Sequence, residues 1–312
     1  MRNASSEIGT IVTDSSTGST PYIGRFAPSP TGPLHFGSLL TAVASFLEAR
    51  CRGGQWLVRV EDIDPPREQP GATEEIIRAL ELHGFEWDGP ITFQSDSRKA
   101  HEAAIQTLIE TNQAYRCGCS RRDLADAPRG ALGIIYPGAC RDGCKADEFA
   151  YRVRTDNVPV QFNDRLQGPQ SQALESESGD FIILRRDGLI AYQLAVVVDD
   201  ELQGITDVVR GIDLMDSTPR QIWLQQLLGY TTPSYCHVPV AINEQGQKLS
   251  KSHGAPGIAL DTAQVNLITA LEMLGQQPPA ELKESSLENI WAWAGENWEI
   301  GVLERQTDIP PL

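Results

Sequence analysis

The pattern of hydrophobic positions is most regular near the start of the chain. A short apolar run over residues 22–27 predicts a buried strand, and prolines and glycines interrupt it over residues 28–33. Apolar side chains then recur at helical spacing, with alanines between them, at Leu39, Leu40, Val43, Phe46 and Leu47. The pattern therefore predicts a strand, a tight turn and a periodic helix.

Other elements follow from the same reasoning along the chain. Apolar runs predict strands at residues 56–60, 181–185 and 239–242, and a polar stretch at 166–179 predicts a loop. Helices are predicted at residues 73–83, 99–114, 217–228, 261–274 and 286–298. Thr73 and Ser217 are the expected caps of the first and third of these helices, and Gly229 should end the third.

More than a hundred residues separate the two halves of the predicted sheet. The stretch between Asp64 and Ala191 is too long for one crossover and carries mixed short strands and turns. We therefore expect an α/β fold in which a Rossmann-like sheet is split by an α+β insertion. The expected divisions are 1–21 as a disordered extension, 22–95 and 191–245 as the Rossmann-like domain, 96–190 as the insertion, and 246–312 as a loop with a small helical region.

Composition narrows the class of protein. The chain has 312 residues, of which 40% are hydrophobic and 22% charged, and no apolar run approaches the length of a membrane span. Residues 1–21 lack the apolar core of a signal peptide, so we expect a disordered extension and a cytoplasmic protein. The net charge of −16 disfavours indiscriminate nucleic-acid binding but allows a local basic face. The candidates for such a face are Arg121, Arg122, Arg129, Arg141, Lys145, Arg152 and Arg154.

The turn before the first helix carries the first candidate chemistry. A strand, a Gly/Pro turn and a helix aim free backbone N–H groups and the positive end of a helix dipole at an anion. His35 stands at the helix entrance, and Gly37 allows a ligand to approach the backbone. The arrangement indicates a nucleotide phosphate site. The alternative is an ordinary turn whose histidine only caps the helix.

A second stretch, KLSKS, follows about two hundred residues later. By itself it could be a solvated lysine loop. Together, PTGPLHFG and KLSKS resemble the paired HIGH and KMSKS motifs of class I aminoacyl-tRNA synthetases, with two departures in the first motif and Leu249 in place of methionine. The resemblance implies that His35 and Lys251 are catalytic and contact ATP. It also implies ATP contacts from Gly37 and Lys248, with Mg²⁺ on the phosphates.

Three further segments concern the amino-acid substrate. The strand at 56–60 ends in carboxylates, which are also typical of a plain acidic loop. RVEDIDPPR and the segments at 191–200 and 205–214 resemble glutamyl-tRNA synthetases. The resemblance implies that Glu61 contacts the ammonium group of L-glutamate and that Arg210 contacts its side-chain carboxylate. It also implies that Tyr192 lines the pocket. The residues of the first turn implied for the same site are Arg25, Phe26, Ala27, Pro28 and Ser29.

Arg210 also bears on the choice of amino acid. It follows two valines expected to be buried, so its guanidinium needs an anionic partner. Asp207 or Asp213 is the structural alternative to a substrate. Because a neutral amide would leave the cation unpaired, at a cost of about 1–3 kcal/mol or more, Arg210 favours glutamate over glutamine.

Four of the six cysteines lie close together within the predicted insertion. Cys117 and Cys119 are followed, after twenty residues, by Cys140 and Cys144. In a cytoplasmic chain such pairs bind metal more often than they form disulfides, and four thiolates could hold zinc tetrahedrally. Four unrelated reduced thiols are the alternative.

Resemblance implies a different fourth ligand. The short glutamyl-Q tRNA(Asp) synthetases carry C-x-C, a gap and Y-x3-C, with the tyrosine oxygen as a ligand. This pattern falls on Cys117, Cys119, Tyr136 and Cys140 and implies a structural Zn²⁺ beside the acceptor-RNA region. Cys144 stays an alternative to Tyr136, because thiolate suits zinc better than a phenol does.

The length of the C-terminal part bears on the acceptor. Roughly sixty residues follow Lys251, too few for an anticodon-reading domain with its connecting helices. With the cysteine pattern, this resembles the glutamyl-Q family over residues 22–260. It implies that a monomer transfers glutamate, activated as glutamyl-adenylate, to the queuosine base of tRNA(Asp). The alternatives are a glutamyl-tRNA synthetase core that charges a tRNA 3′ end, a nucleotidyltransferase that makes a small-molecule adenylate, and a non-catalytic RNA-binding paralogue.

Overall fold

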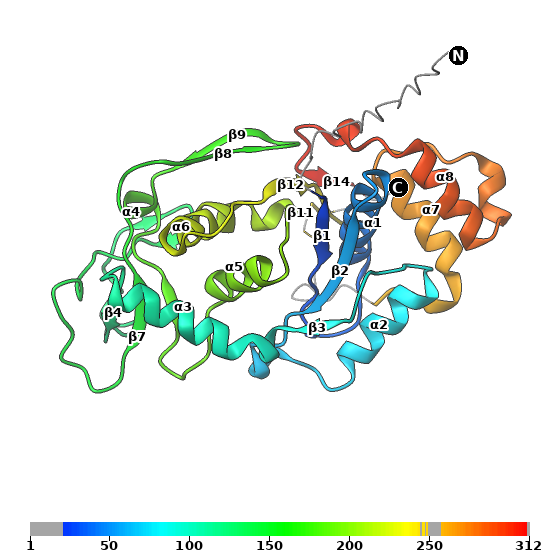
Figure 1. Cartoon of the computed structure of the whole chain (residues 1–312). Helices are drawn as coiled ribbons and strands as arrows, with labels where there is room; N and C mark the ends of the chain where they lie inside the picture. The colour runs from blue at the N-terminus through cyan, green and yellow to red at the C-terminus, as the bar shows by residue number, and fades with distance from the viewer. Residues whose placement is uncertain (1–20, 244, 247, 249–256, 311–312) are drawn as a thin grey trace, which may run out of the picture.

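The computed structural model describes residues 21–243, 245–246, 248 and 257–310 (Figure 1). Its strands are β1 (Ile23–Phe26), β2 (Gln55–Val60), β3 (Thr92–Phe93), β4 (Ala114–Cys117), β5 (Arg129–Gly130), β6 (Gly133–Ile134), β7 (Ala150–Val153), β8 (Val160–Asp164), β9 (Gly168–Gln172), β10 (Ile182–Leu184), β11 (Asp207–Gly211), β12 (Ser234–Val238), β13 (Val240–Ala241) and β14 (Asp308–Ile309). Its α-helices are α1 (Phe36–Cys51), α2 (Ala72–Leu82), α3 (Arg98–Glu110), α4 (Leu174–Glu177), α5 (Tyr192–Leu202), α6 (Thr218–Leu228), α7 (Ala263–Met273) and α8 (Leu287–Asn297).

Two groups of parallel strands meet edge to edge at β1. β1 pairs with β2 and β2 with β3, while β11 pairs with β12. β1 adjoins β11, because the Thr206 N–H donates to the Ile23 carbonyl at 3.0 Å and the Ile23 N–H donates to the Thr206 hydroxyl at 2.8 Å. The order β3–β2–β1–β11–β12 therefore switches direction between β1 and β11. Open α/β sheets form a ligand crevice at this point, outside the carboxyl ends of the strands.

Helix α1 packs against this junction. It contacts β1, β2 and β11 on one side and α7 and α8 on the other (Figure 1). The five predicted apolar positions, from Leu39 to Leu47, are all buried, which confirms the helix predicted from their spacing. Phe46 meets the fully buried Trp56 edge to face, with ring centroids 5.2 Å apart. The first strand–turn–helix unit is thus the centre of the main core.

The insertion forms the end of the molecule that lies opposite α7 and α8 (Figure 1). β10, β7 and β4 make a small antiparallel sheet, and the β8–β9 hairpin reaches back from it towards β12. Apolar side chains of α3, β10, α5, α6 and β12 form one buried cluster. The insertion therefore shares a core with the second half of the sheet. We retain its boundaries at residues 96 and 190 as a proposal about chain organisation.

Two predicted helix ends differ from the structure. α2 begins at Ala72 after Gly71, which has a left-handed backbone with φ of 83°, so Thr73 lies inside the first turn and does not cap it. The helix predicted to reach residue 114 ends at Glu110, and Ala114 begins β4. Gly71 can adopt the left-handed conformation that starts α2 one residue earlier, and Asn112, with φ of 58°, turns the chain from α3 into β4.

Two other local predictions are also wrong. The stretch 166–179 is not a loop throughout, because it contains β9 and α4. Its side chains are polar because both faces of β9 are partly exposed, so no alternating pattern marks the strand. Ser217 precedes α6 as predicted, but its hydroxyl makes no cap and accepts a hydrogen bond from the Gln193 amide at 2.9 Å. Gly229 ends α6 in a left-handed conformation, as expected.

The extension predicted over residues 1–21 lies outside the described residues except for Pro21. Within the part of the chain that the structure describes, no helix combines the length and the apolar content needed to cross a bilayer.

Candidate active site

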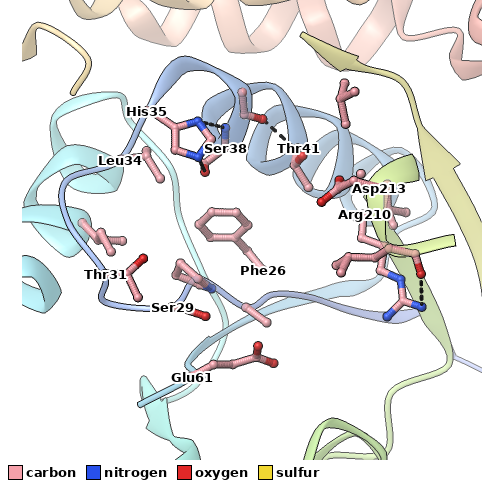
Figure 2. Close-up of a pocket in the computed structure, with 18 of the residues that line it drawn as sticks. Phe26, Ser29, Thr31, Leu34, His35, Ser38, Thr41, Glu61, Arg210 and Asp213 are labelled. Carbon is pink, nitrogen blue, oxygen red and sulfur yellow. Dashed lines mark hydrogen bonds between the residues drawn. The ribbon is translucent and has the colours of Figure 1, made fainter. Parts of the chain in front are cut away.

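A cavity of about 690 Å³ lies beside the junction of β1 and β11, against the start of α1. Figure 2 shows Glu61 and Ser29 on one side of it, His35 and Ser38 opposite, and Arg210 with Asp213 at one end. Every predicted glutamate or ATP residue that the structure describes lines this cavity: Arg25, Phe26, Ala27, Pro28, Ser29, His35, Gly37, Glu61, Tyr192, Arg210 and Lys248. Lys251 lies outside the described residues.

The N-terminus of α1 forms the anion-favouring side of the cavity. His35 is the N-cap, and its Nδ1 accepts a hydrogen bond from the Ser38 backbone N–H at 3.2 Å. A neutral ring that accepts at Nδ1 carries its proton on Nε2, which lies 2.9 Å from the Ser38 hydroxyl. The first turn of α1 contains no acidic residue that would oppose a bound anion.

Sequence reasoning missed two hydroxyl groups on this side. Ser38 and Thr41 line the cavity three and six residues after the cap His35. Their spacing is the signal that could have identified them, because Ser38 follows His35 by three residues and Thr41 follows Ser38 by three, and residues three apart are neighbours on a helix surface.

Lys248 is paired within the cavity. Its ammonium group lies 2.5 Å from the Asp213 carboxylate, and both side chains are partly exposed. Asp213 is one of the two alternative partners expected for Arg210, but in the structure it pairs with Lys248. A lysine held here can supply a positive charge to a ligand that binds between the N-terminus of α1 and Arg210.

Arg210 is buried at the end of β11 and has no carboxylate partner among the described residues. Its Nε donates to His237 Nε2 at 3.0 Å, and its Nη2 donates to the Thr218 hydroxyl at 2.8 Å. Nη1 is buried and makes no hydrogen bond within the described structure. The expectation of an aspartate partner is wrong for Asp207, which accepts from the Thr206 hydroxyl and lies 4.0 Å from Arg165.

A second group of charges lies beneath the cavity and is balanced. Asp200 accepts from Arg25 Nε at 3.1 Å and from Arg59 Nη2 at 2.8 Å, and Arg59 also contacts Glu61 at 3.4 Å. The two arginines and two carboxylates are all at least 90% buried. Sequence reasoning missed Asp200 and Arg59, although an aspartate ending a buried apolar run is a usable signal.

The environment sets the protonation of these groups. Burial alone would raise the pKa of Asp200, but the charges of Arg25 and Arg59 outweigh burial and hold that pKa below its usual value. Burial raises the pKa of Glu61, and the nearby arginines oppose this effect. Burial likewise raises the pKa of Tyr192, which keeps its phenol neutral at physiological pH. Because the second group of charges is already balanced, Arg210 remains a buried cation in the cavity wall that can bind an external carboxylate.

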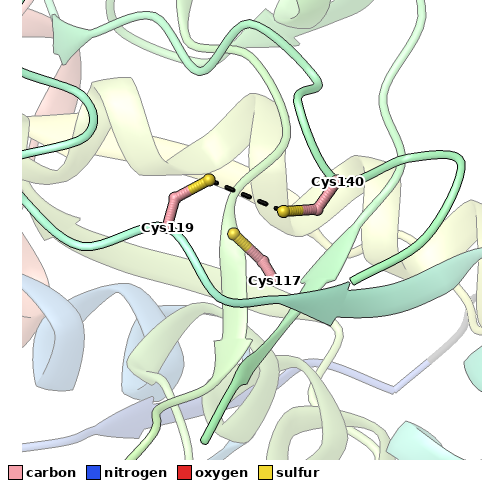
Figure 3. Close-up of side chains that lie close together, drawn as sticks. All are labelled: Cys117, Cys119 and Cys140. Atoms are coloured by element: carbon pink, nitrogen blue, oxygen red, sulfur yellow. Dashed lines mark hydrogen bonds between the residues drawn. The ribbon is translucent and has the colours of Figure 1, made fainter. Parts of the chain in front are cut away.

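The cysteine cluster is a separate candidate metal centre. The sulfur atoms of Cys117, Cys119 and Cys140 all lie within 4.8 Å of one another and point together (Figure 3). Zinc bonds to sulfur at about 2.3 Å, so a tetrahedral site places its sulfurs close to 4 Å apart. The three thiols therefore fit a metal ion of this kind.

Tyr136 occupies the fourth side of this cluster. Its hydroxyl lies 3.3 Å from the Cys117 sulfur and 3.6 Å from the Cys119 sulfur, and it accepts from the Cys140 N–H at 3.0 Å. Cys144 is not part of the three-thiol group; its sulfur lies beside Gly118.

Arg152 supports the cluster from behind. Its guanidinium lies 3.9 Å from the Tyr136 ring centroid, and its Nε donates to the Cys117 sulfur at 3.3 Å. A buried cation here offsets the negative charge that metal-bound thiolates carry. Sequence reasoning had placed Arg152 among the candidates for an exposed basic face, and that expectation is wrong because the side chain is buried.

Two more of those seven basic residues have internal partners. Arg141 binds the Asp180 carboxylate at 2.6 Å, and Arg154 Nη2 donates to the Arg141 carbonyl at 2.8 Å. The exposed candidates are Arg121, Arg122, Arg129 and Lys145.

Solved structures share this fold. A glutamate tRNA ligase from Elizabethkingia meningosepticum CCUG26117, solved in complex with its amino acid, matches with a TM-score of 0.76 at 22% identity and covers 93% of this chain and 66% of that one. The glutamate-tRNA synthetase of Elizabethkingia anophelis gives the same TM-score and identity and covers 93% and 68% of the two chains.

Fold and cavity together define the catalytic domain of a class I aminoacyl-tRNA synthetase. The profile of the family described as tRNA synthetases class I (E and Q), catalytic domain, matches residues 23–282. A glutamyl-Q tRNA(Asp) synthetase from Dechloromonas aromatica (strain RCB) is 52% identical over 295 residues, covering 93% of this chain and 98% of that protein. One from Pseudomonas paraeruginosa is 51% identical over 290 residues, covering 93% and 97%. The chain belongs to the glutamyl-Q tRNA(Asp) synthetase family, as its motifs predicted.

Proposed function

We propose that this protein activates L-glutamate with ATP and transfers the glutamyl group to the queuosine base of tRNA(Asp). The observation that carries the glutamate part is Arg210, a buried cation whose Nη1 has no partner among the described residues and which lines the cavity. The names of the relatives support the RNA part.

The cavity can orient glutamate by charge alone. The side-chain carboxylate would bind Nη1 of Arg210, and the ammonium group would face the Glu61 carboxylate. Arg25 is already paired with Asp200, so it supports the pocket without competing for the substrate side chain. Tyr192 and the backbone of residues 26–29 complete the walls. Glutamine would leave Arg210 without an anion, which favours glutamate.

Activation is a displacement at phosphorus. An oxygen of the glutamate α-carboxylate forms a bond to the α-phosphorus of ATP, the bond to the bridging oxygen breaks, and pyrophosphate leaves. His35, Gly37 and the N-terminus of α1 would hold the phosphates, with Lys248 and Lys251 stabilising the charge that develops on the leaving group. Mg²⁺, when bound with the nucleotide, would neutralise part of that charge. A queuosine hydroxyl then attacks the activated carbonyl and releases AMP.

We further propose that Cys117, Cys119, Cys140 and Tyr136 hold a structural Zn²⁺. The fit of the three sulfurs and the position of the Tyr136 hydroxyl support this ligand set over one with Cys144. The ion would pin the segment between β4 and β7 and take no part in the chemistry.

All proposed contacts with glutamate and ATP come from a single chain, so we propose that the protein acts as a monomer. Its proposed substrates, ATP and tRNA, place it in the cytoplasm.

One experiment tests the proposed reaction. Purified protein is incubated with labelled glutamate, ATP and tRNA(Asp) with or without queuosine, and the modified base is checked for protection of its diol from periodate. We expect label only in the queuosine-containing tRNA. Label in queuosine-free tRNA(Glu) would favour an enzyme that charges the 3′ end. Absence of glutamate-dependent pyrophosphate exchange with any tRNA would favour the non-catalytic paralogue.

Lys248→Ala is expected to raise the KM for ATP at least about tenfold, since one charge-assisted contact to a phosphate is worth about 1.5–3 kcal/mol. The KM for glutamate should change little. The check is pyrophosphate exchange at varied ATP. Lys283→Ala is the matched control, because Lys283 pairs with Glu272 and does not line the cavity. Equal KM values for ATP in both variants would contradict the assignment of Lys248.

A further inference from the structure

The tip of the β8–β9 hairpin docks behind the proposed glutamate site. Leu166, at the tip, is buried in the main core, and the Arg165 N–H donates to the Tyr235 carbonyl of β12 at 3.0 Å. The Gln167 amide donates to the carbonyls of His237 and Gln306 at 3.1 and 2.8 Å. Figure 1 shows the hairpin running from the insertion to this edge of the sheet. The hairpin thereby brings its last β8 residue, Asp164, under β12.

Asp164 contacts the histidine that contacts Arg210. Asp164 Oδ2 lies 2.6 Å from His237 Nδ1, and both side chains are 0% exposed. His237 and Arg210 are direct partners in the parallel register of β12 and β11. His237 Nε2 lies 3.0 Å from Arg210 Nε and 3.1 Å from the Thr218 hydroxyl. Three buried side chains thus form a line from the insertion to the cavity wall.

Hydrogen-bond chemistry allows one arrangement of protons along this line. An ionised carboxylate only accepts, so the ring proton must sit on Nδ1 and point at Asp164. Nε2 then offers a lone pair, and a guanidinium can only donate to it. Burial lowers the pKa of His237, which keeps the ring neutral, and the contact with His237 holds the pKa of Asp164 below its usual value against the effect of burial.

We propose that Asp164 is a positioning residue for glutamate selection: it holds His237 in the Nδ1–H tautomer, which fixes the Arg210 guanidinium with Nη1 left for the substrate carboxylate. The insertion therefore supplies part of the amino-acid site through the hairpin tip. This inference rests on the proposed role of Arg210 in binding glutamate.

Asp164→Asn is the variant that tests the tautomer. The remaining oxygen can still accept from the backbone N–H groups of Leu166 and Gln167, as Oδ1 does at 3.0 and 2.9 Å, so the tip keeps its turn. The new amide N–H₂ would donate to Nδ1 and move the ring proton to Nε2, where it opposes Arg210. The same replacement behind a catalytic-triad histidine leaves geometry intact but imposes the wrong tautomer. We expect the KM for glutamate to rise at least about tenfold, with the KM for ATP changed less than about twofold.

A double-mutant cycle separates this role from simple loss of structure. In His237→Gln the side-chain oxygen can accept from Arg210 without any ring tautomer. Adding Asp164→Asn in that background should therefore raise the KM for glutamate by less than about twofold. An equal rise in both backgrounds would overturn the proposal. So would a rise in Gln167→Ala equal to that in Asp164→Asn, because the Gln167 side chain anchors the hairpin tip through two backbone carbonyls and makes no hydrogen bond to the three side chains.

The tautomer can also be read in the unmodified protein. The chain contains five histidines, so nitrogen-15 spectra of the full protein labelled at histidine resolve each ring. We expect a neutral His237 protonated at Nδ1, identified by its loss in His237→Gln. A proton on Nε2 would refute the proposal whatever KM values the variants give. This readout needs no turnover, so an inactive wild-type protein would refute the proposed function while leaving the tautomer measurable.

Discussion

Replacing Arg210 by glutamine is expected to raise the KM for glutamate by about a hundredfold or more, because removing one partner of a buried charge pair costs about 2–5 kcal/mol. The described structure gives this cation no carboxylate of its own, and the substrate would supply the only anion. The side-chain amide introduced in Arg210→Gln can still donate to His237, so the pairing of β11 with β12 should be kept. Pyrophosphate exchange at varied glutamate measures the effect.

The matched control for this variant is Arg98→Gln. Arg98 makes an exposed ion pair with Glu102 on α3 and does not line the cavity, so its loss should leave both KM values near those of the wild type. A KM for glutamate within about threefold of wild type in Arg210→Gln would remove Arg210 from the site. A parallel rise in the KM for ATP would instead indicate a general disturbance of the cavity.

The second large effect is expected at the cysteine cluster. Native protein should contain about one zinc per chain by elemental analysis, and Cys140→Ser should lose most of it. Because structural zinc contributes about 10 kcal/mol or more of binding energy to folding, the melting temperature of Cys140→Ser should fall by roughly 5 °C or more. The change should appear in metal content and stability whether or not activity is measured.

Two further variants identify the fourth ligand. Tyr136→Phe keeps the ring under Arg152 but removes the oxygen, so it should weaken zinc retention against a chelator. Cys144→Ser should retain zinc as the native protein does, since its sulfur lies outside the three-thiol group. If Tyr136→Phe retained zinc and Cys144→Ser lost it, Cys144 would be the fourth ligand in place of Tyr136. Native protein without bound zinc would reject the site.

The motif residues were accessible from sequence because each motif is short and continuous. PTGPLHFG follows β1, RVEDIDPPR contains the end of β2, and the carboxyl ends of parallel strands share one edge of a sheet. This rule is sufficient to bring Glu61 and His35 towards one cavity, where the structure places both. The partners beneath that cavity were not accessible. Asp200 belongs to a helix and pairs with arginines of two strands far away in the chain.

The chain's own sequence determined the α/β class, the central strand–turn–helix unit and the residues worth testing, because periodicity and motif spacing are local properties. Only the tertiary structure decided which charges pair. In the structure Asp213 pairs with Lys248, and Arg210 donates to His237. Tyr136, and not Cys144, contacts the three-thiol group. Those choices depend on the β11–β12 register and on how loops and the β8–β9 hairpin dock. Contacts of this kind join segments many residues apart and leave no periodic signal in either one.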